Sequence, residues 1–351
     1  MAKKKTLVEQ AKENAAEAEK VQAASSLSKT QAELAAVRKA YKEALGQIAS
    51  LEQQVQIASG WSVPKRLKTT KPKRNAPEGE AAFGIVLTDW HAEEVVDPAT
   101  VNGINEHNLE VHRGRVSRLW PKCIQLLNAN RTMSEIDEIV VWVLGDMFSN
   151  HLHPELIEGN ELGPMEAVDL VRSELVTGID YLHEHADVER LRVVCCWGNH
   201  GRITDKVRHS TGYTHSLEWL MYHHLAELYT RYDSPIEWHV EKGMLAYADV
   251  KGWTVRAHHG HGFRYLGGVG GLTIPLKKAI PQWNTTRRAD YDLFGHWHTF
   301  DRGWTWVSCP CLIGYSAYAL SLKAEKQPPA QAALVFDRER GLVYAEPIFV
   351  D

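Results

Sequence analysis

The chain has 351 residues, of which 44% are hydrophobic and 24% charged, and its formal net charge is −4. This composition is typical of a folded globular protein with one large domain and an appendage, and it excludes a uniformly basic nucleic-acid binder. No run of 18 apolar residues occurs, so we expect no membrane partner and no membrane-spanning helix. Five cysteines, an odd number, and the lack of an apolar signal segment after Met1 favour the cytoplasm.

The first 60 residues predict a long helix. They are rich in Ala, Glu, Lys and Gln, contain no proline, and carry apolar side chains at spacings of three and four from Leu27 to Val55. This spacing is typical of the a/d seam of a coiled coil, whose apolar side chains stay exposed to water unless the helix packs on another chain. We therefore expect region 1–60 to form a homo-oligomer. A lone solvated helix, stabilised by charge pairs, is the alternative.

Residues 61–80 predict a basic linker. Between Pro64 and Pro77 the chain has six Lys and Arg residues and no acidic residue. Such a segment is typical of an extended tether, and blocks of like charge often bind nucleic acid. Both interpretations stay open.

Residues 81–351 predict an α/β domain that carries the chemistry. Apolar, β-branched runs typical of buried strands cover residues 84–88, 139–144, 191–197 and 253–257, and amphipathic helices are expected between them. Polar motifs follow most of these strands: Asp89-Trp90-His91, Gly145-Asp146, Gly198-Asn199-His200, His259-Gly260-His261 and Gly295-His296-Trp297-His298. Side chains placed directly after strands are held at one edge of a sheet. Because mixed Asp, His and Asn ligands suit divalent first-row metals, the motifs predict a two-metal hydrolase.

The order of the motifs, D-x-H, G-D, G-N-H, H and G-H-x-H, resembles that of the calcineurin-like metallophosphoesterases over roughly residues 82 to 310. The blocks that contain Asp146 and His296 also resemble phage-encoded members and, more distantly, the repair exonuclease branch. The resemblance implies a two-sheet α/β sandwich flanked by helices, here preceded by the N-terminal coiled-coil helix. For a phage-encoded protein, the cytoplasm would be that of the host.

The resemblance also implies a set of metal ligands. The first ion would be held by Asp89, His91, Asp146 and His298, and the second by Asp146, Asn199, His259 and His296. Asp146 would therefore bridge two divalent ions, with Mn preferred and Fe, Zn, Ni or Mg as alternatives. A water shared by both ions would lose a proton near neutral pH and attack phosphorus, while His200 would act as the general acid.

Two positions depart from the family pattern. Gly201 stands where most relatives have Asp or Glu, so the carboxylate that would orient His200 is absent or comes from elsewhere. Arg202 follows, and its planar guanidinium could bind a phosphate through two oxygens as part of the catalytic set. His261 stands where close relatives more often have Asp, and it is either a substrate contact or a ligand in place of His259. The position of His259 nearer the strand end favours His259.

Further residues are candidates for binding substrate. In an extended segment, His151 and His153 would point to the same side after Asp146, and an incidental position is equally open. The stretch 263–288 has no acidic residue and contains Lys277, Lys278, Arg287 and Arg288. Its length predicts a mobile basic insert at the mouth of the site.

The sequence therefore predicts a metal-dependent phosphoesterase that hydrolyses phosphodiesters of nucleic acid. The choice of substrate rests on analogy with the exonuclease branch and on the two basic segments. One alternative is a phosphomonoesterase or cyclic-nucleotide phosphodiesterase, which would need a closed pocket. Another is a scaffold or regulatory protein with a vestigial metal site, which Gly201 keeps open.

Overall fold

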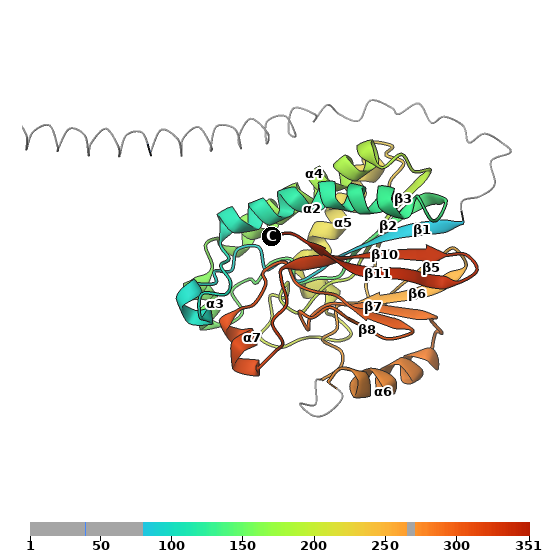
Figure 1. Ribbon diagram of the computed structural model, residues 1–351. Coiled ribbons are helices and arrows are strands. Elements are labelled where there is room, and N and C mark those ends of the chain that lie inside the picture. Colours follow the sequence, from blue (N-terminus) through green and yellow to red (C-terminus); the bar gives the residue numbers. More distant parts are fainter. Residues whose placement is uncertain (1–38, 40–79, 265–270) are drawn as a thin grey trace, which may run out of the picture. The chain divides into compact units, whose positions relative to one another are not determined.

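The structure is a computed structural model that describes residue 39 and residues 80–264 and 271–351. Apart from Lys39 and Glu80, the predicted coiled coil 1–60 and linker 61–80 lie outside the described residues. Residues 81–351 contain two β-sheets stacked face to face, with helices on both outer faces (Figure 1). The predicted two-sheet α/β sandwich is thus confirmed.

The first sheet has six strands in the order β11-β10-β1-β2-β3-β4. Four of these strands are parallel: β1 (Ala81–Leu87), β2 (Ile136–Val143), β3 (Arg190–Cys195) and β4 (Glu237–Val240). On the other side of β1 the sheet continues with β10 (Ala330–Asp337) and β11 (Gly341–Phe349), each antiparallel to the strand before it. Side chains alternate between the two faces of β1, since Phe83 and Ile85 pack toward the helices while Ala82 and Val86 pack toward the other sheet. Both faces of the strand are therefore buried, as its continuous apolar run predicted.

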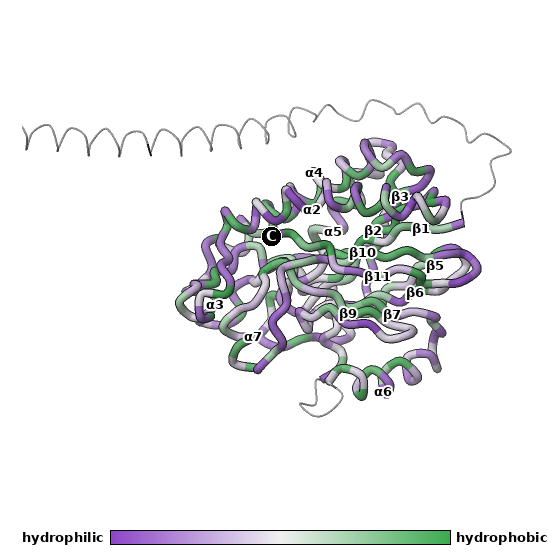
Figure 2. Tube along the Cα trace, in the orientation of Figure 1, coloured by the Kyte–Doolittle hydropathy of each residue, from purple (hydrophilic) through white to green (hydrophobic). Residues whose placement is uncertain are grey.

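The second sheet has five strands in the order β5-β6-β7-β9-β8. Its centre is parallel, formed by β6 (Trp253–His258), β7 (Tyr291–Phe294) and β9 (Trp306–Ser308), with β5 (Ala246–Val250) and β8 (Asp301–Arg302) antiparallel at the edges. Val255, Ala257 and Leu293 meet the first sheet in a common apolar core. Figure 2 shows the hydrophobic stretches gathered on the central strands.

Three long helices cover the outer face of the first sheet: α2 (Leu109–Asn130), α4 (Pro164–His185) and α5 (Leu217–Arg231). They are amphipathic, as their apolar spacing predicted, and their buried residues join the same core as Phe83 and Ile85. The short elements η1 (Pro98–Val101), α3 (Pro154–Gly159), η2 (Tyr213–His215) and α7 (Ala317–Leu322) lie in the connections. No helix in the described part of the chain combines the length and apolarity that a membrane crossing needs.

The stretch 263–288, of which residues 265–270 lie outside the described residues, differs in its second half from the mobile insert that we predicted. Its second half forms α6 (Thr273–Asn284), which packs Leu272 and Leu276 against Phe294 and Trp306 on the outer face of the second sheet. Arg256 binds both oxygens of Asp292, at 2.6 and 3.0 Å, and its Nη1 donates to Asn284 Oδ1 (3.0 Å) at the end of this helix. The apolar residues of α6 therefore pack against the second sheet. The prediction of a basic insert, made from length and charge, did not include this packing.

Candidate metal centre

The five predicted motifs lie in the loops that follow β1, β2, β3, β6 and β7, and these loops meet at one end of the sheets. Backbone bonds join them: Asp89 N–H donates to the carbonyl of Gly145 (3.0 Å), and Gly295 N–H to that of His259 (2.9 Å). The side chains form two groups, within each of which the candidate ligand atoms lie within 4.8 Å of one another. The first group is Asp89, His91 and His298, and the second is Asp146, His259 and His296.

In the first group the free carboxylate oxygen of Asp89 is aimed at histidine nitrogens. Its Oδ2 accepts hydrogen bonds from Thr88 Oγ1 (2.8 Å) and His296 N (2.7 Å). Its Oδ1 is buried, has no hydrogen-bond partner among the described residues, and lies 3.3 Å from His298 Nε2. His91 Nε2 lies 3.2 Å from the same His298 nitrogen. An unsatisfied buried anionic oxygen between converging imidazole nitrogens is the arrangement that a divalent cation completes.

The second group converges in the same way. His259 Nε2 lies 2.7 Å from Asp146 Oδ2 and 3.2 Å from His296 Nδ1. Asn199 follows β3, and its Oδ1 is buried with no hydrogen-bond partner in the described part of the chain. These donor types fit a divalent first-row ion, so both groups fit the metal pair that the motif order implied.

Outer hydrogen bonds fix which nitrogen each histidine presents. His259 Nδ1 donates to the carbonyl of Leu144 (2.8 Å), because a carbonyl can only accept, and its Nε2 faces the group. His91 Nδ1 lies 2.7 Å from Ser149 Oγ, whose own proton is directed to Glu94 Oε2 (2.5 Å). Nδ1 of His91 is therefore the donor and Nε2 is left as a ligand atom. Such outer contacts fix the ring orientation and tautomer of metal-binding histidines.

The backbone at these ligands is held in an unusual conformation. Positive φ angles between 46° and 71° occur at Asp89, His91, Asp146, His296 and His298. Residues with a side chain rarely adopt this left-handed region, and such strain clusters at functional sites. Because five of the seven predicted ligands share it, the rest of the fold must hold the loops in place against their own preference.

Two glycines in the motifs allow the loops that carry the candidate ligands to approach one another closely. A Cβ at Gly198 would lie 2.1 Å from Asp146 Oδ1, and a Cβ at Gly295 would lie 2.1 Å from Thr88 Oγ1. Neither loop could therefore reach its position with any larger residue there. The glycines of G-N-H and G-H-x-H serve to bring the ligand loops together.

The charges of the two groups favour binding a cation. Burial alone would raise the pKa of Asp89, but His298 and His259 lower it to about 2. Burial also opposes ionisation of Asp146, yet His259 and His200 bring its pKa well below the ordinary value. Burial tends to lower the pKa of His259, whereas Asp146 and Asp89 raise it to about 9. Both carboxylates are therefore anions at neutral pH, and a metal ion would compete with the proton of His259.

His200 lies beside both groups and is held by two hydrogen bonds. Its backbone N–H donates to Asp146 Oδ1 (2.7 Å), and its ring Nδ1 donates to the carbonyl of Ser149 (2.9 Å). Its ring meets that of His91 edge to face, with 4.9 Å between centroids. The Ser149 carbonyl thus orients His200 where relatives were expected to use a carboxylate after G-N-H.

Two buried glutamates support the centre, and the sequence did not reveal either of them. Glu218, in the first turn of α5, accepts the N–H of Met147 (2.8 Å) and of Gly198 (2.7 Å). Glu93 accepts the N–H of Ser149 (3.1 Å) and of Asn150 (2.7 Å). Burial, followed by the neighbouring Asp146, raises the pKa of Glu218 to about 8. In sequence Glu218 looks like an ordinary acidic residue of a first helical turn, and only Gly201 hinted that a carboxylate comes from elsewhere.

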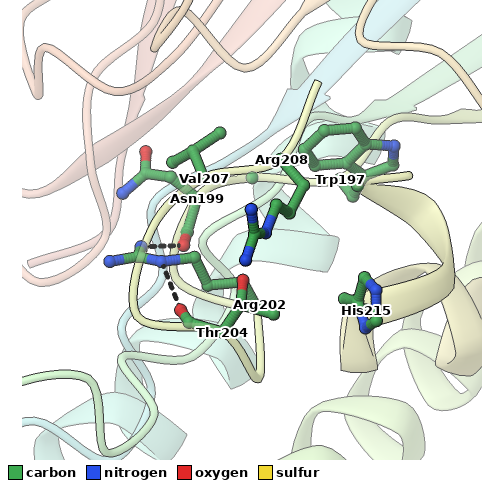
Figure 3. A pocket seen from close by; sticks show the side chains of 9 residues that line it. Trp197, Asn199, Arg202, Thr204, Val207, Arg208 and His215 are labelled. Carbon is green, nitrogen blue, oxygen red and sulfur yellow. Dashed lines mark hydrogen bonds between the residues drawn. The ribbon is translucent and has the colours of Figure 1, made fainter. Parts of the chain in front are cut away.

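A pocket lies beside Asn199, and Arg202 forms part of its wall (Figure 3). The guanidinium of Arg202 donates to the carbonyls of Asn199, Thr204 (3.0 Å) and Asp205 (3.3 Å). These bonds hold the loop that follows Asn199. Since an arginine has five N–H groups, a contact to phosphate through the remaining ones stays a prediction. The other lining residues are Trp197, Gly198, Thr204, Val207, Arg208, Gly212 and His215.

His261 lies next to the second group but is not a member of it. Its ring centroid is 5.6 Å from those of His259 and Trp197, and neither of its ring nitrogens has a hydrogen-bond partner among the described residues. His259 rather than His261 is thus the residue that joins Asp146, as its place at the strand end favoured. A substrate contact by His261 stays a prediction.

The other predicted substrate contacts lie on the surface. His151 and His153 are exposed and belong to neither group, and His153 directly precedes α3. Lys277, Lys278, Arg287 and Arg288 are exposed on α6 and just after it. The guanidinium of Arg287 lies over the ring of Tyr247, 4.1 Å from its centroid.

Comparisons with known proteins give likenesses to solved structures alone. No family model and no curated protein matches the chain. A hypothetical protein from Pyrococcus horikoshii OT3 is similar, with 13% identity, a TM-score of 0.37, and 77% of this chain and 89% of that chain covered. A single mutant of Vps29 from Entamoeba histolytica is 11% identical with a TM-score of 0.31, covering 76% of this chain and 98% of that one. Vacuolar protein sorting 29 from Cryptosporidium parvum is 11% identical with a TM-score of 0.29, covering 77% and 98%. Such low identities and TM-scores assign neither a family nor an activity.

Proposed function

We propose that this protein is a metal-dependent phosphoesterase that binds two divalent cations, with Mn as the first to test. The observation that carries the proposal is the pair of buried groups, Asp89–His91–His298 and Asp146–His259–His296, side by side at the ends of five strands. Two adjacent cation sites with mixed carboxylate and imidazole ligands are typical of enzymes that hydrolyse phosphate esters.

Asp89, His91 and His298 would hold one cation, Asn199, His259 and His296 the other, and Asp146 both. When bound, the two cations supply an activated water and neutralise charge on the phosphoryl oxygens. His200 would give a proton from Nε2 to the leaving oxygen, because its Nδ1 is already engaged by the Ser149 carbonyl. The N–H groups of Arg202 that its loop does not use would bind a phosphoryl oxygen.

We infer that the substrate is a phosphodiester of nucleic acid. The support is local positive charge on a chain whose net charge is −4. Arg208 and His215 line the pocket beside Asn199, and Lys277, Lys278 and Arg288 are exposed on and after α6. Such residues can bind phosphates that flank the scissile bond. A relation to phage-encoded members or to the repair exonuclease branch stays a prediction.

The test is hydrolysis by the full chain with Mn against single-stranded DNA, double-stranded DNA, RNA, bis-nitrophenyl phosphate and nitrophenyl phosphate. We expect Mn-dependent cleavage of the aryl diester and of at least one nucleic acid, abolished by a chelator and in the Asp146→Asn variant. Cleavage of the monoester alone would favour a phosphatase. A protein that binds two Mn ions yet cleaves none of these substrates would overturn the proposed activity.

A further inference from the structure

Glu218 occupies the space beneath the second group that Gly201 leaves free. Its side chain is fully buried, and a Cβ at Gly201 would lie 2.6 Å from its Cγ. The first turn of α5 is fixed at this place because the side chain of Ser216 caps the helix. The carboxylate thus enters the centre from a helix, and the glycine after His200 makes room for it.

The two oxygens of Glu218 each bind a different ligand loop. Oε1 accepts the N–H of Met147, the residue after Asp146, and Oε2 accepts the N–H of Gly198, the residue before Asn199. Burial excludes water as a substitute acceptor, so each of these N–H groups depends on its Glu218 oxygen. One side chain therefore sets the distance between Asp146 and Asn199, and of the two proposed cations only the second would need both of these ligands.

Glu93 offers a matched comparison within the same centre. It is equally buried and also accepts two backbone N–H bonds, but from Ser149 and Asn150. Ser149 in turn orients His91, which belongs to the first group. The two glutamates are alike in burial and in their pair of backbone bonds, although Glu93 Oε1 also accepts from Asn160 Nδ2 (3.4 Å), and they differ in the group that they adjoin.

We propose that Glu218 is a positioning residue for the second cation: it clamps the loops of Asp146 and Asn199 at the distance that binding requires. In Glu218→Gln, an amide NH₂ replaces one oxygen and faces a backbone N–H, so one of the two loops loses its acceptor. The inference rests on the proposed two-metal function.

The experiment measures Mn binding to the full-length protein by equilibrium dialysis. The wild type should bind two Mn ions, and Glu218→Gln should weaken one of them roughly 10- to 100-fold, as outer contacts of metal ligands typically do. Double variants identify the affected ion. In His91→Ala the second group is the site with the higher Mn affinity, and adding Glu218→Gln should lower that affinity. His259→Ala leaves the first group, and adding Glu218→Gln should change it little.

Glu93→Gln is the control for a general loss of packing, and it should show the opposite pattern in the same two backgrounds. Equal effects of both glutamine variants in both backgrounds would overturn the inference, as would two Mn ions bound to Glu218→Gln with unchanged affinity. If Glu218→Gln does not fold, Gly201→Ala takes its place, because the added methyl displaces the carboxylate without removing it. A wild-type protein that binds no Mn would instead refute the proposed function itself.

Discussion

Among single residues, Asp146 is the one that we propose as the bridge between the two cations. One of its oxygens lies 2.7 Å from His259 Nε2, and the other accepts the N–H of His200. Its own φ of 52° is left-handed, so its position depends on the loops around it. An anionic carboxylate between two dications would reduce their repulsion and set their separation.

Replacing Asp146 by Asn removes this negative charge at nearly constant shape. We expect both bound Mn ions to be weakened together, with hydrolysis of an aryl diester lost in parallel. Metal analysis of the dialysed variant checks this. Two Mn ions per chain with near-normal turnover would contradict the assignment of Asp146 as the bridge.

Replacing His200 by Ala separates proton transfer from metal binding. His200 is outside both ligand groups, so Mn content should stay at the wild-type level while kcat falls by about 100-fold or more. The loss should be smallest for esters with good leaving groups, because these need little protonation. The measurement compares kcat for a nitrophenyl diester and an oligonucleotide. Equal losses on both would exclude His200 as the acid.

Among the secondary-structure elements, two helices have structural roles that their sequences did not predict. The first turn of α5 supplies Glu218 to the ligand loops, whereas α6 closes the outer face of the second sheet. Arg287 is engaged with the ring of Tyr247, while Lys277, Lys278 and Arg288 are exposed. If α6 contributes to binding, its lysines and Arg288 are the residues available to bind phosphate.

The triple variant Lys277→Gln, Lys278→Gln and Arg288→Gln tests this contribution. Each phosphate contact releases counterions, so the slope of log affinity against log salt for single-stranded DNA should flatten by roughly 2 units. Hydrolysis of a small aryl ester, which reaches only the centre, is the internal control and should not change. An unaltered slope would show that α6 serves packing alone. Loss of both activities would show that the substitutions disturb the fold.

At the scale of the whole molecule, several histidines are buried in the neutral form. His107 is fully buried away from the candidate ligands, with Nδ1 donating to the carbonyl of Glu94 (2.7 Å). Burial, followed by His112, lowers the pKa of His107 to about 3, against 6.5 for a free side chain. Unfolding below pH 6.5 therefore takes up a proton that the folded state does not bind.

This linkage predicts how stability depends on pH. The contribution of His107 is fully present above pH 6.5 and is lost as the pH falls toward 3, at about 1.4 kcal/mol per pH unit. Between pH 7 and 5, His107→Gln should therefore lose about 2 kcal/mol less of its free energy of unfolding than the wild type. Urea unfolding at both pH values, with metal ions removed by a chelator, measures these free energies. His224→Gln, at an exposed position on α5, is the matched control. Equal losses in wild type and His107→Gln would contradict the prediction.

The amino-acid sequence was enough to predict the strands β1, β2, β3 and β6 and the candidate ligands that follow most of them. Apolar runs revealed these strands, because strands that are buried on both faces are rich in apolar side chains. The motifs behind these strands identified the side chains of both groups, because a loop at a strand end holds its residues rigidly. These signals are local, so they can be read without knowing the fold.

Other features of the centre follow from packing and are encoded in no local pattern. Glu93 and Glu218 reach the centre from positions that look like ordinary acidic residues, and α6 lies on a sheet face although the length and charge of its stretch predicted a mobile insert. In each case the outcome depends on contacts between segments far apart in the chain, which form only when both sheets are packed.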